Sequence, residues 1–169
     1  MARPSFSNFP YSNRKVPILP ELRPILLVED SPRDLELTLA ALEKCQLANE
    51  IVIARDGAEA LDYLFGTGAH AGEGSGDATV VLLDLKLPKV DGLEVLARIK
   101  KDAKLRHIPV VMLTSSREER DLVQSYELGV NAFVVKPVEF NEFFKAIQDL
   151  GVFWAILNEA PPGYERNET

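Results

Sequence analysis

The sequence predicts an α/β fold in which a parallel five-stranded sheet carries helices on both faces. Five short apolar runs recur along the chain, and helix-like segments separate them. The runs are almost continuously hydrophobic and do not alternate with polar residues, as strands covered on both faces require. Regular alternation of strand and helix favours parallel pairing with right-handed crossovers, so we expect a doubly wound sheet.

Each element can be assigned from its local pattern. The expected strands are ILLV (25–28), EIVIA (50–54), TVVLL (79–83), IPVVMLT (108–114) and NAFVV (131–135). The first helix should begin after Ser31, with Pro32 in its first turn and Asp34 as an acid at its third position, a typical helix start. Further helices are expected over residues 58–65, 93–101, 118–129 and about 139–158. For such a chain we expect strand order 2-1-3-4-5, the flavodoxin-like variant of the doubly wound fold.

Composition limits the classes of function. The 169 residues carry a net charge of −7, which argues against DNA or RNA as the main partner. No apolar stretch is long enough to span a membrane, and the single cysteine, Cys45, fits a reducing compartment, so we expect a cytoplasmic protein. We expect an N-terminal extended arm over residues 1–23, one domain over residues 24–150, and an extension of the last helix with a tail over residues 151–169.

Polar residues stand where the expected strands end. Glu29 and Asp30 follow the first strand, Asp84 the third and Lys136 the fifth, while Thr114 ends the fourth. Taken singly, each fits a helix cap or a surface residue. Ligands bind at the carboxyl ends of strands in this architecture, and converging carboxylates repel unless a hard cation such as Mg²⁺ lies among them. A lysine and a hydroxyl beside that cation would hold a phosphoryl group, with Asp84 as the nucleophile that forms an aspartyl phosphate.

The segments ILLVED, VVLLDLKLPKVDG, VVMLTSS and FVVKP, in this order, resemble the receiver domain of two-component response regulators over roughly residues 24–150. The resemblance implies that Asp84 takes a phosphoryl group from a histidine kinase. It also implies a phosphoacceptor protein that is not an enzyme, with Mg²⁺-dependent self-phosphorylation and autodephosphorylation as its only chemistry. The implied metal ligands are Glu29, Asp30, Asp84 and the backbone carbonyl of Lys86; the implied phosphate-binding and switch residues are Thr114, Lys136 and Phe133. For Phe133, an ordinary core aromatic is the alternative.

The C-terminal region suggests which surface of the domain contacts another protein. The last expected helix has apolar residues on two sides, which predicts a homodimer interface that includes Phe143, Phe153, Trp154 and Ile156. The alternative is that these residues fold back over their own domain. The Gly-rich segment 66–78, the ending LGVFWAILNEAPP and the stand-alone format resemble regulators paired with bacterial phytochrome kinases. That resemblance implies a red/far-red light-sensing histidine kinase as the phosphodonor.

Two other functions remain as alternatives. A haloacid-dehalogenase-like phosphatase also combines Asp, Thr, Lys and Mg²⁺, but its nucleophile belongs to an Asp-x-Asp pair after the first strand. Here that strand is followed by Glu-Asp-Ser-Pro. A phosphorylation-independent interaction scaffold on the same fold is disfavoured because Glu29, Asp30, Asp84, Thr114 and Lys136 are all present, and such scaffolds often lose one.

Overall fold

One parallel sheet organises the protein. The structure, a computed structural model, describes residues 22–71, 78–115 and 119–136, together with short helical pieces at 141–142, 145–146 and 148–149. The strands are β1 (Ile25–Val28), β2 (Ile51–Ala54), β3 (Val80–Asp84), β4 (Val110–Thr114) and β5 (Ala132–Val135). All neighbouring pairs are parallel, in the order β2-β1-β3-β4-β5, which confirms the predicted topology.

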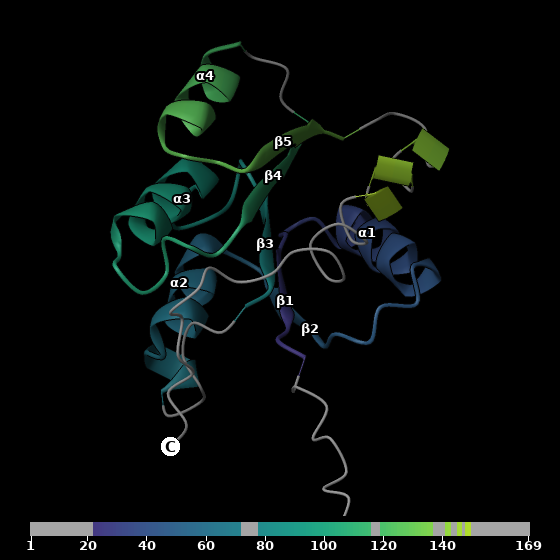
Figure 1. Cartoon of the computed structure of the whole chain (residues 1–169), viewed down its shortest axis with the longest axis horizontal. Helices are drawn as coiled ribbons and strands as arrows, with labels where there is room; N and C mark the ends of the chain where they lie inside the picture. Colours follow the sequence, from purple (N-terminus) through teal and green to yellow (C-terminus); the bar gives the residue numbers. More distant parts are fainter. Residues whose placement is uncertain are drawn as a thin grey trace, which may run out of the picture.

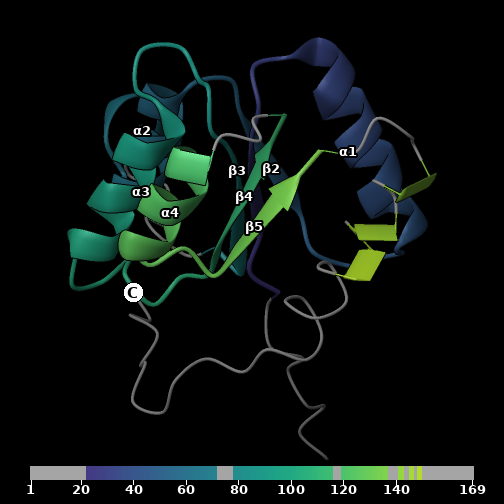
Figure 2. The same cartoon turned by 90° about the horizontal axis from the view of Figure 1, so that it is seen from above.

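Helices cover both faces of this sheet. Helix α1 (Pro32–Lys44) lies on one face, while α2 (Gly57–Phe65), α3 (Gly92–Lys101) and α4 (Glu119–Glu127) lie on the other (Figures 1 and 2). The helical pieces between residues 141 and 149 lie on the side of α1 in both views. A short 3₁₀ turn (Gly68–His70) follows α2.

The core has one layer on each side of the sheet, because successive strand residues point to opposite faces. Val110 and Met112 of β4 belong to the layer shared with α2 and α3, whereas Val111 and Leu113 belong to the layer under α1. All four residues of β1 are 0–1% exposed. Burial on both faces explains why the strands are continuously apolar in the sequence.

Apart from the last expected helix, which lies mostly outside the described residues, the predicted elements agree with the observed ones to within about two residues at their ends, with one informative difference. Asp84 is the last residue of β3 and pairs with Leu113 of β4, so the sheet itself fixes its backbone. Helix α1 begins as expected: the Ser31 side chain accepts a hydrogen bond from the Asp34 amide.

Several predictions fall on residues that the structure does not describe. These are the N-terminal arm up to residue 21, most of the last helix, and the four residues of the proposed dimer interface, Phe143, Phe153, Trp154 and Ile156. Among the described residues, no helix has the length and apolar character needed to cross a membrane.

Candidate functional site

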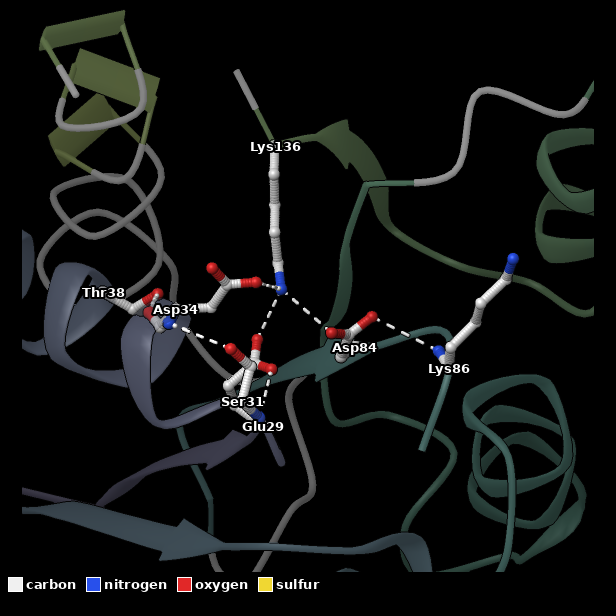
Figure 3. Close-up of polar contacts among 7 residues, drawn as sticks. All are labelled: Glu29, Ser31, Asp34, Thr38, Asp84, Lys86 and Lys136. Carbon is white, nitrogen blue, oxygen red and sulfur yellow. Dashed lines mark hydrogen bonds and ion pairs between the residues drawn. The ribbon is translucent and has the colours of Figure 1, made fainter. Parts of the chain in front are cut away.

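Charged side chains meet around Lys136 at the carboxyl edge of the sheet. The Lys136 Nζ lies 2.5 Å from Glu29 Oε2, 2.9 Å from Asp34 Oδ2 and 2.9 Å from Asp84 Oδ2 (Figure 3). The Glu29 side chain is 2% exposed, that of Asp84 12% and that of Asp34 33%. These residues follow or end β1, β3 and β5 and begin α1, so they surround the point where the winding of the sheet reverses.

Backbone contacts hold these side chains in place. The Glu29 amide donates to the carbonyl of Ala54 at 3.0 Å, and Glu29 Oε1 accepts from the Ser31 amide at 3.1 Å. The Lys136 amide donates to the carbonyl of Thr114 at 2.6 Å, which extends the β4–β5 pairing to the base of the lysine. Because each group is anchored by backbone, the cluster is organised before any ligand arrives.

The loop after β3 closes tightly on the strand end. The Gly92 amide donates to the Leu85 carbonyl at 2.7 Å, and a Cβ on Gly92 would lie 2.2 Å from the Asp84 carbonyl oxygen. A side chain at this position would therefore push the loop away from the strand. Asp91 caps α3 by accepting a hydrogen bond from the Glu94 amide at 2.9 Å.

Burial and pairing shift the protonation of two members of the cluster. Burial, and to a smaller extent the neighbouring Asp84 carboxylate, raise the pKa of Glu29 to about 7, although the hydrogen bond from Lys136 acts in the opposite direction. Burial alone would lower the pKa of Lys136, but hydrogen bonds to Glu29, Asp84 and Asp34 outweigh it and raise the pKa above its usual value. Lys136 is therefore a permanent cation near neutral pH.

The structure brings together three of the residues predicted from the sequence, Glu29, Asp84 and Lys136. Thr114 is buried at the end of β4, adjacent to Lys136 through its backbone. Phe133 is half-buried and packs against the core layer under α2 and α3.

Two other predicted residues lie apart from the cluster. Asp30 is exposed and does not belong to the group of carboxylates that converge in the described part of the chain. The Lys86 amide donates to Asp84 Oδ1 at 3.3 Å, while its side chain is exposed and points away from the cluster (Figure 3).

Asp34 is the residue that sequence reasoning missed. Its position in the first turn of a helix was explained by capping and by the helix dipole, and these account for most such acids. The available signal was its spacing: Asp34 lies four residues before Thr38, which is buried, so both share the helix face turned toward the sheet.

The carboxylates fit a hard divalent cation. Glu29, Asp34 and Asp84 each offer an oxygen, and these oxygens all lie within 4.8 Å of one another. When all three are ionised, the carboxylates and one ammonium leave two uncompensated negative charges, which a cation that prefers oxygen ligands, such as Mg²⁺ or Mn²⁺, would neutralise.

Comparison with known proteins decides the family. The sequence model of the family "response regulator receiver domain" matches residues 25–148, and this range contains every residue of the cluster. The chain belongs to this family. The parallel sheet and its strand order agree with a receiver domain.

Several relatives of this receiver domain are closely similar. The solved structure of the bacteriophytochrome response regulator AtBRR is 81% identical, with a TM-score of 0.68, and the match covers 83% of this chain and 100% of that one. Response regulator Rcp1 of Synechocystis sp. is 44% identical over 77% of this chain and 87% of its own length. Its Mn²⁺-bound crystal structure superposes with a TM-score of 0.76 over 82% of this chain and 99% of that one, at 42% identity.

A third relative is described by a different process from that of the bacteriophytochrome response regulator. The probable methanogenesis regulatory protein FilR2 of Methanothrix harundinacea is 42% identical over 81% of this chain and 86% of its own length. Similarity of this kind therefore identifies the receiver domain, and the choice of kinase has to be argued separately.

Proposed function

We propose that the protein is a response regulator that accepts a phosphoryl group on Asp84 from a bacteriophytochrome histidine kinase and signals through protein contacts. The observation that carries the proposal is that Asp84, Lys136 and two further carboxylates converge at the point where the winding of the sheet reverses. The kinase assignment is supported by the 81% identity to AtBRR, which is described as a bacteriophytochrome response regulator.

The chemistry follows from the position of Asp84. One of its carboxylate oxygens attacks the phosphorus of the kinase's phosphohistidine in line with the P–N bond; that bond breaks, and its electron pair stays on the imidazole nitrogen. Asp84 Oδ2 is held by Lys136 at 2.9 Å and Oδ1 by the Lys86 amide at 3.3 Å, so the attacking carboxylate is already oriented. Lys136 offsets negative charge beside the nucleophile, and the Thr114 hydroxyl is the proposed partner for a phosphoryl oxygen.

A divalent cation is part of the proposal. When bound, Mg²⁺ supplies neutralisation of the charge that accumulates on the phosphoryl oxygens. Its proposed protein ligands are Glu29, Asp30, Asp84 and the Lys86 carbonyl; in the described part of the chain, Asp34 is the further carboxylate that lies near Glu29 and Asp84. The Mn²⁺-bound form of Rcp1, a relative with the same fold, supports the binding of a divalent cation. With the same groups, we propose that the protein, a phosphoacceptor, phosphorylates itself from small phosphodonors and later loses the phosphoryl group to water.

The homodimer remains a prediction, because its four residues lie outside the described part of the chain. Because residues 25–148 match the receiver domain, the family match argues against the phosphatase alternative. The scaffold alternative differs from the proposal only in whether Asp84 is phosphorylated.

Phosphotransfer tests the proposed function directly. A bacteriophytochrome histidine kinase, first autophosphorylated with radiolabelled ATP, is expected to pass its label to this protein at least about tenfold faster than an unrelated histidine kinase does, because partner surfaces steer productive encounters. Chelation of divalent cations by EDTA should stop the transfer. Equal rates from the two kinases would overturn the phytochrome pairing, and undiminished transfer in EDTA would contradict the metal site.

Metal binding should depend on pH through Glu29. Because the pKa of Glu29 is raised to about 7, the carboxyl group holds a proton below that pH and must release it before a cation can bind. We expect the apparent Mn²⁺ affinity to fall by up to about tenfold per pH unit below pH 7 and to level off above it. Titrations followed by Mn²⁺ electron paramagnetic resonance would measure this. Glu29→Gln, which cannot release a proton, should flatten the profile; an unchanged profile in that variant would assign the proton to another group.

A further inference from the structure

Asp34 reaches the phosphoacceptor cluster from a different element than the other carboxylates. Its Oδ2 lies 2.9 Å from Lys136 Nζ, the same separation as that between Asp84 Oδ2 and this nitrogen (Figure 3). Lys136 is thus shared between a residue of α1 and the residue that we propose to be phosphorylated. A helix-capping role would not require a contact with a lysine 102 residues further along the chain.

The first turn of α1 fixes Asp34 firmly. Its amide donates to Ser31 Oγ at 3.3 Å, and its carbonyl accepts from Thr38 Oγ1 at 2.8 Å. The flanking Leu35 and Thr38 are 4% and 1% exposed, so this turn is packed against the domain. The backbone of Asp34 is therefore held in place, and its carboxylate reaches Lys136 from a fixed position on α1.

Of the three carboxylates that pair with Lys136, that of Asp34 is the one that water can replace most easily. The Asp34 side chain is 33% exposed, compared with 12% for Asp84 and 2% for Glu29. Water can replace an ion-pair partner at low cost where the group is already hydrated, and only at high cost where it is buried. Of the three contacts of Lys136, the one with Asp34 therefore costs the least to break.

We propose that Asp34 is a positioning residue that tethers the Lys136 ammonium to α1 in the unphosphorylated protein and opposes its full engagement with phosphorylated Asp84. The inference rests on the proposed function. A phosphoryl group on Asp84 adds negative charge on the side of Lys136 opposite α1, so the two carboxylate-bearing elements compete for one cation. Asp34 thereby sets how strongly the domain favours its phosphorylated form.

Binding of beryllofluoride, an anion that mimics a phosphoryl group on a carboxylate, tests the tether at saturating Mg²⁺. Asp34→Asn keeps the shape of the side chain and removes its charge, so Lys136 is released. We expect the variant to bind beryllofluoride about fivefold more tightly than wild type, the effect of losing one competing charge-assisted hydrogen bond. Glu36→Gln is the matched control, because Glu36 is an exposed acid two residues further along α1 and its loss should leave the midpoint unchanged.

A double-mutant cycle shows whether Asp34 acts through Lys136. In a Lys136→Met background, Asp34→Asn should change beryllofluoride binding by less than about 1.5-fold, because the coupled partner is gone. Nitrogen NMR of the Lys136 Nζ gives a second measurement that needs no anion: Asp34→Asn should shift this resonance, and Glu36→Gln should not.

The results distinguish a failure of the proposed function from a failure of the proposed role of Asp34. Wild-type protein that takes up no beryllofluoride with Mg²⁺ would overturn the proposed function itself. Wild-type binding together with an unchanged midpoint in Asp34→Asn, or an equal effect in the Lys136→Met background, would overturn only the role of Asp34.

Discussion

Asp84→Asn is expected to reduce phosphorylation to background, at least about a hundredfold below wild type, with both a kinase and acetyl phosphate as donors. The amide oxygen of asparagine is a far weaker nucleophile than a carboxylate and cannot form a stable acyl phosphate. The fold should survive, because asparagine has the same shape and Lys136 keeps its contacts with Glu29 and Asp34. Radiolabel incorporation and intact-protein mass spectrometry would measure the effect.

Asp91→Asn is the matched control for this experiment. Asp91 lies in the same loop and caps α3, a task that asparagine performs about as well, so labelling should remain at the wild-type level. Label retained by Asp84→Asn would place the phosphoacceptor elsewhere. Loss of label without any loss of signalling output would revive the phosphorylation-independent scaffold.

The strands of the sheet could be predicted because each of them shows the same short sequence pattern. Strands buried on both faces, such as β1 with 0–1% exposure, have to be continuously apolar, and this pattern is visible without any knowledge of tertiary contacts. Helix starts were predictable for the same reason, since Ser31 and Asp91 cap their helices through bonds that span three residues. The strand order 2-1-3-4-5 was expected as one common variant of the doubly wound sheet, since right-handed connections alone do not select it.

The site was predictable only where a strand delivers the side chain. Glu29, Asp84 and Lys136 follow or end strands, so parallel topology brings them to one edge. Asp34 comes from a helix, and its contact with Lys136 depends on how α1 is rotated against the sheet, which a helix-capping pattern does not reveal. Asp30 shows the converse: it is adjacent to Glu29 in the sequence, but it is exposed while Glu29 is buried.

Lys136→Met is expected to make folding depend on divalent cations. The Lys136 side chain is 9% exposed and is the cation shared by Glu29, Asp34 and Asp84. Removing one partner of a buried ionic cluster costs about 3–5 kcal/mol, because the remaining charges are left desolvated and repel one another. We expect the free energy of unfolding in EDTA to fall by about this amount, and to fall more at pH 8 than at pH 6, where Glu29, with its pKa near 7, is partly protonated.

Added Mg²⁺ should reverse this loss. In wild type a metal ion has to compete with the Lys136 ammonium for the same carboxylates, whereas in Lys136→Met it does not, so the increase in melting temperature on adding Mg²⁺ should be larger in the variant. Lys89→Met is the matched control: Lys89 also pairs with a carboxylate, Asp56 at 2.5 Å, but its side chain is 66% exposed. Because the Lys89 ammonium remains hydrated in the pair, loss of the pair should leave the response to Mg²⁺ unchanged. If Lys136→Met were as stable as wild type in EDTA, or gained no more from Mg²⁺, Lys136 would not be the counter-ion that holds this acidic cluster together in the resting protein.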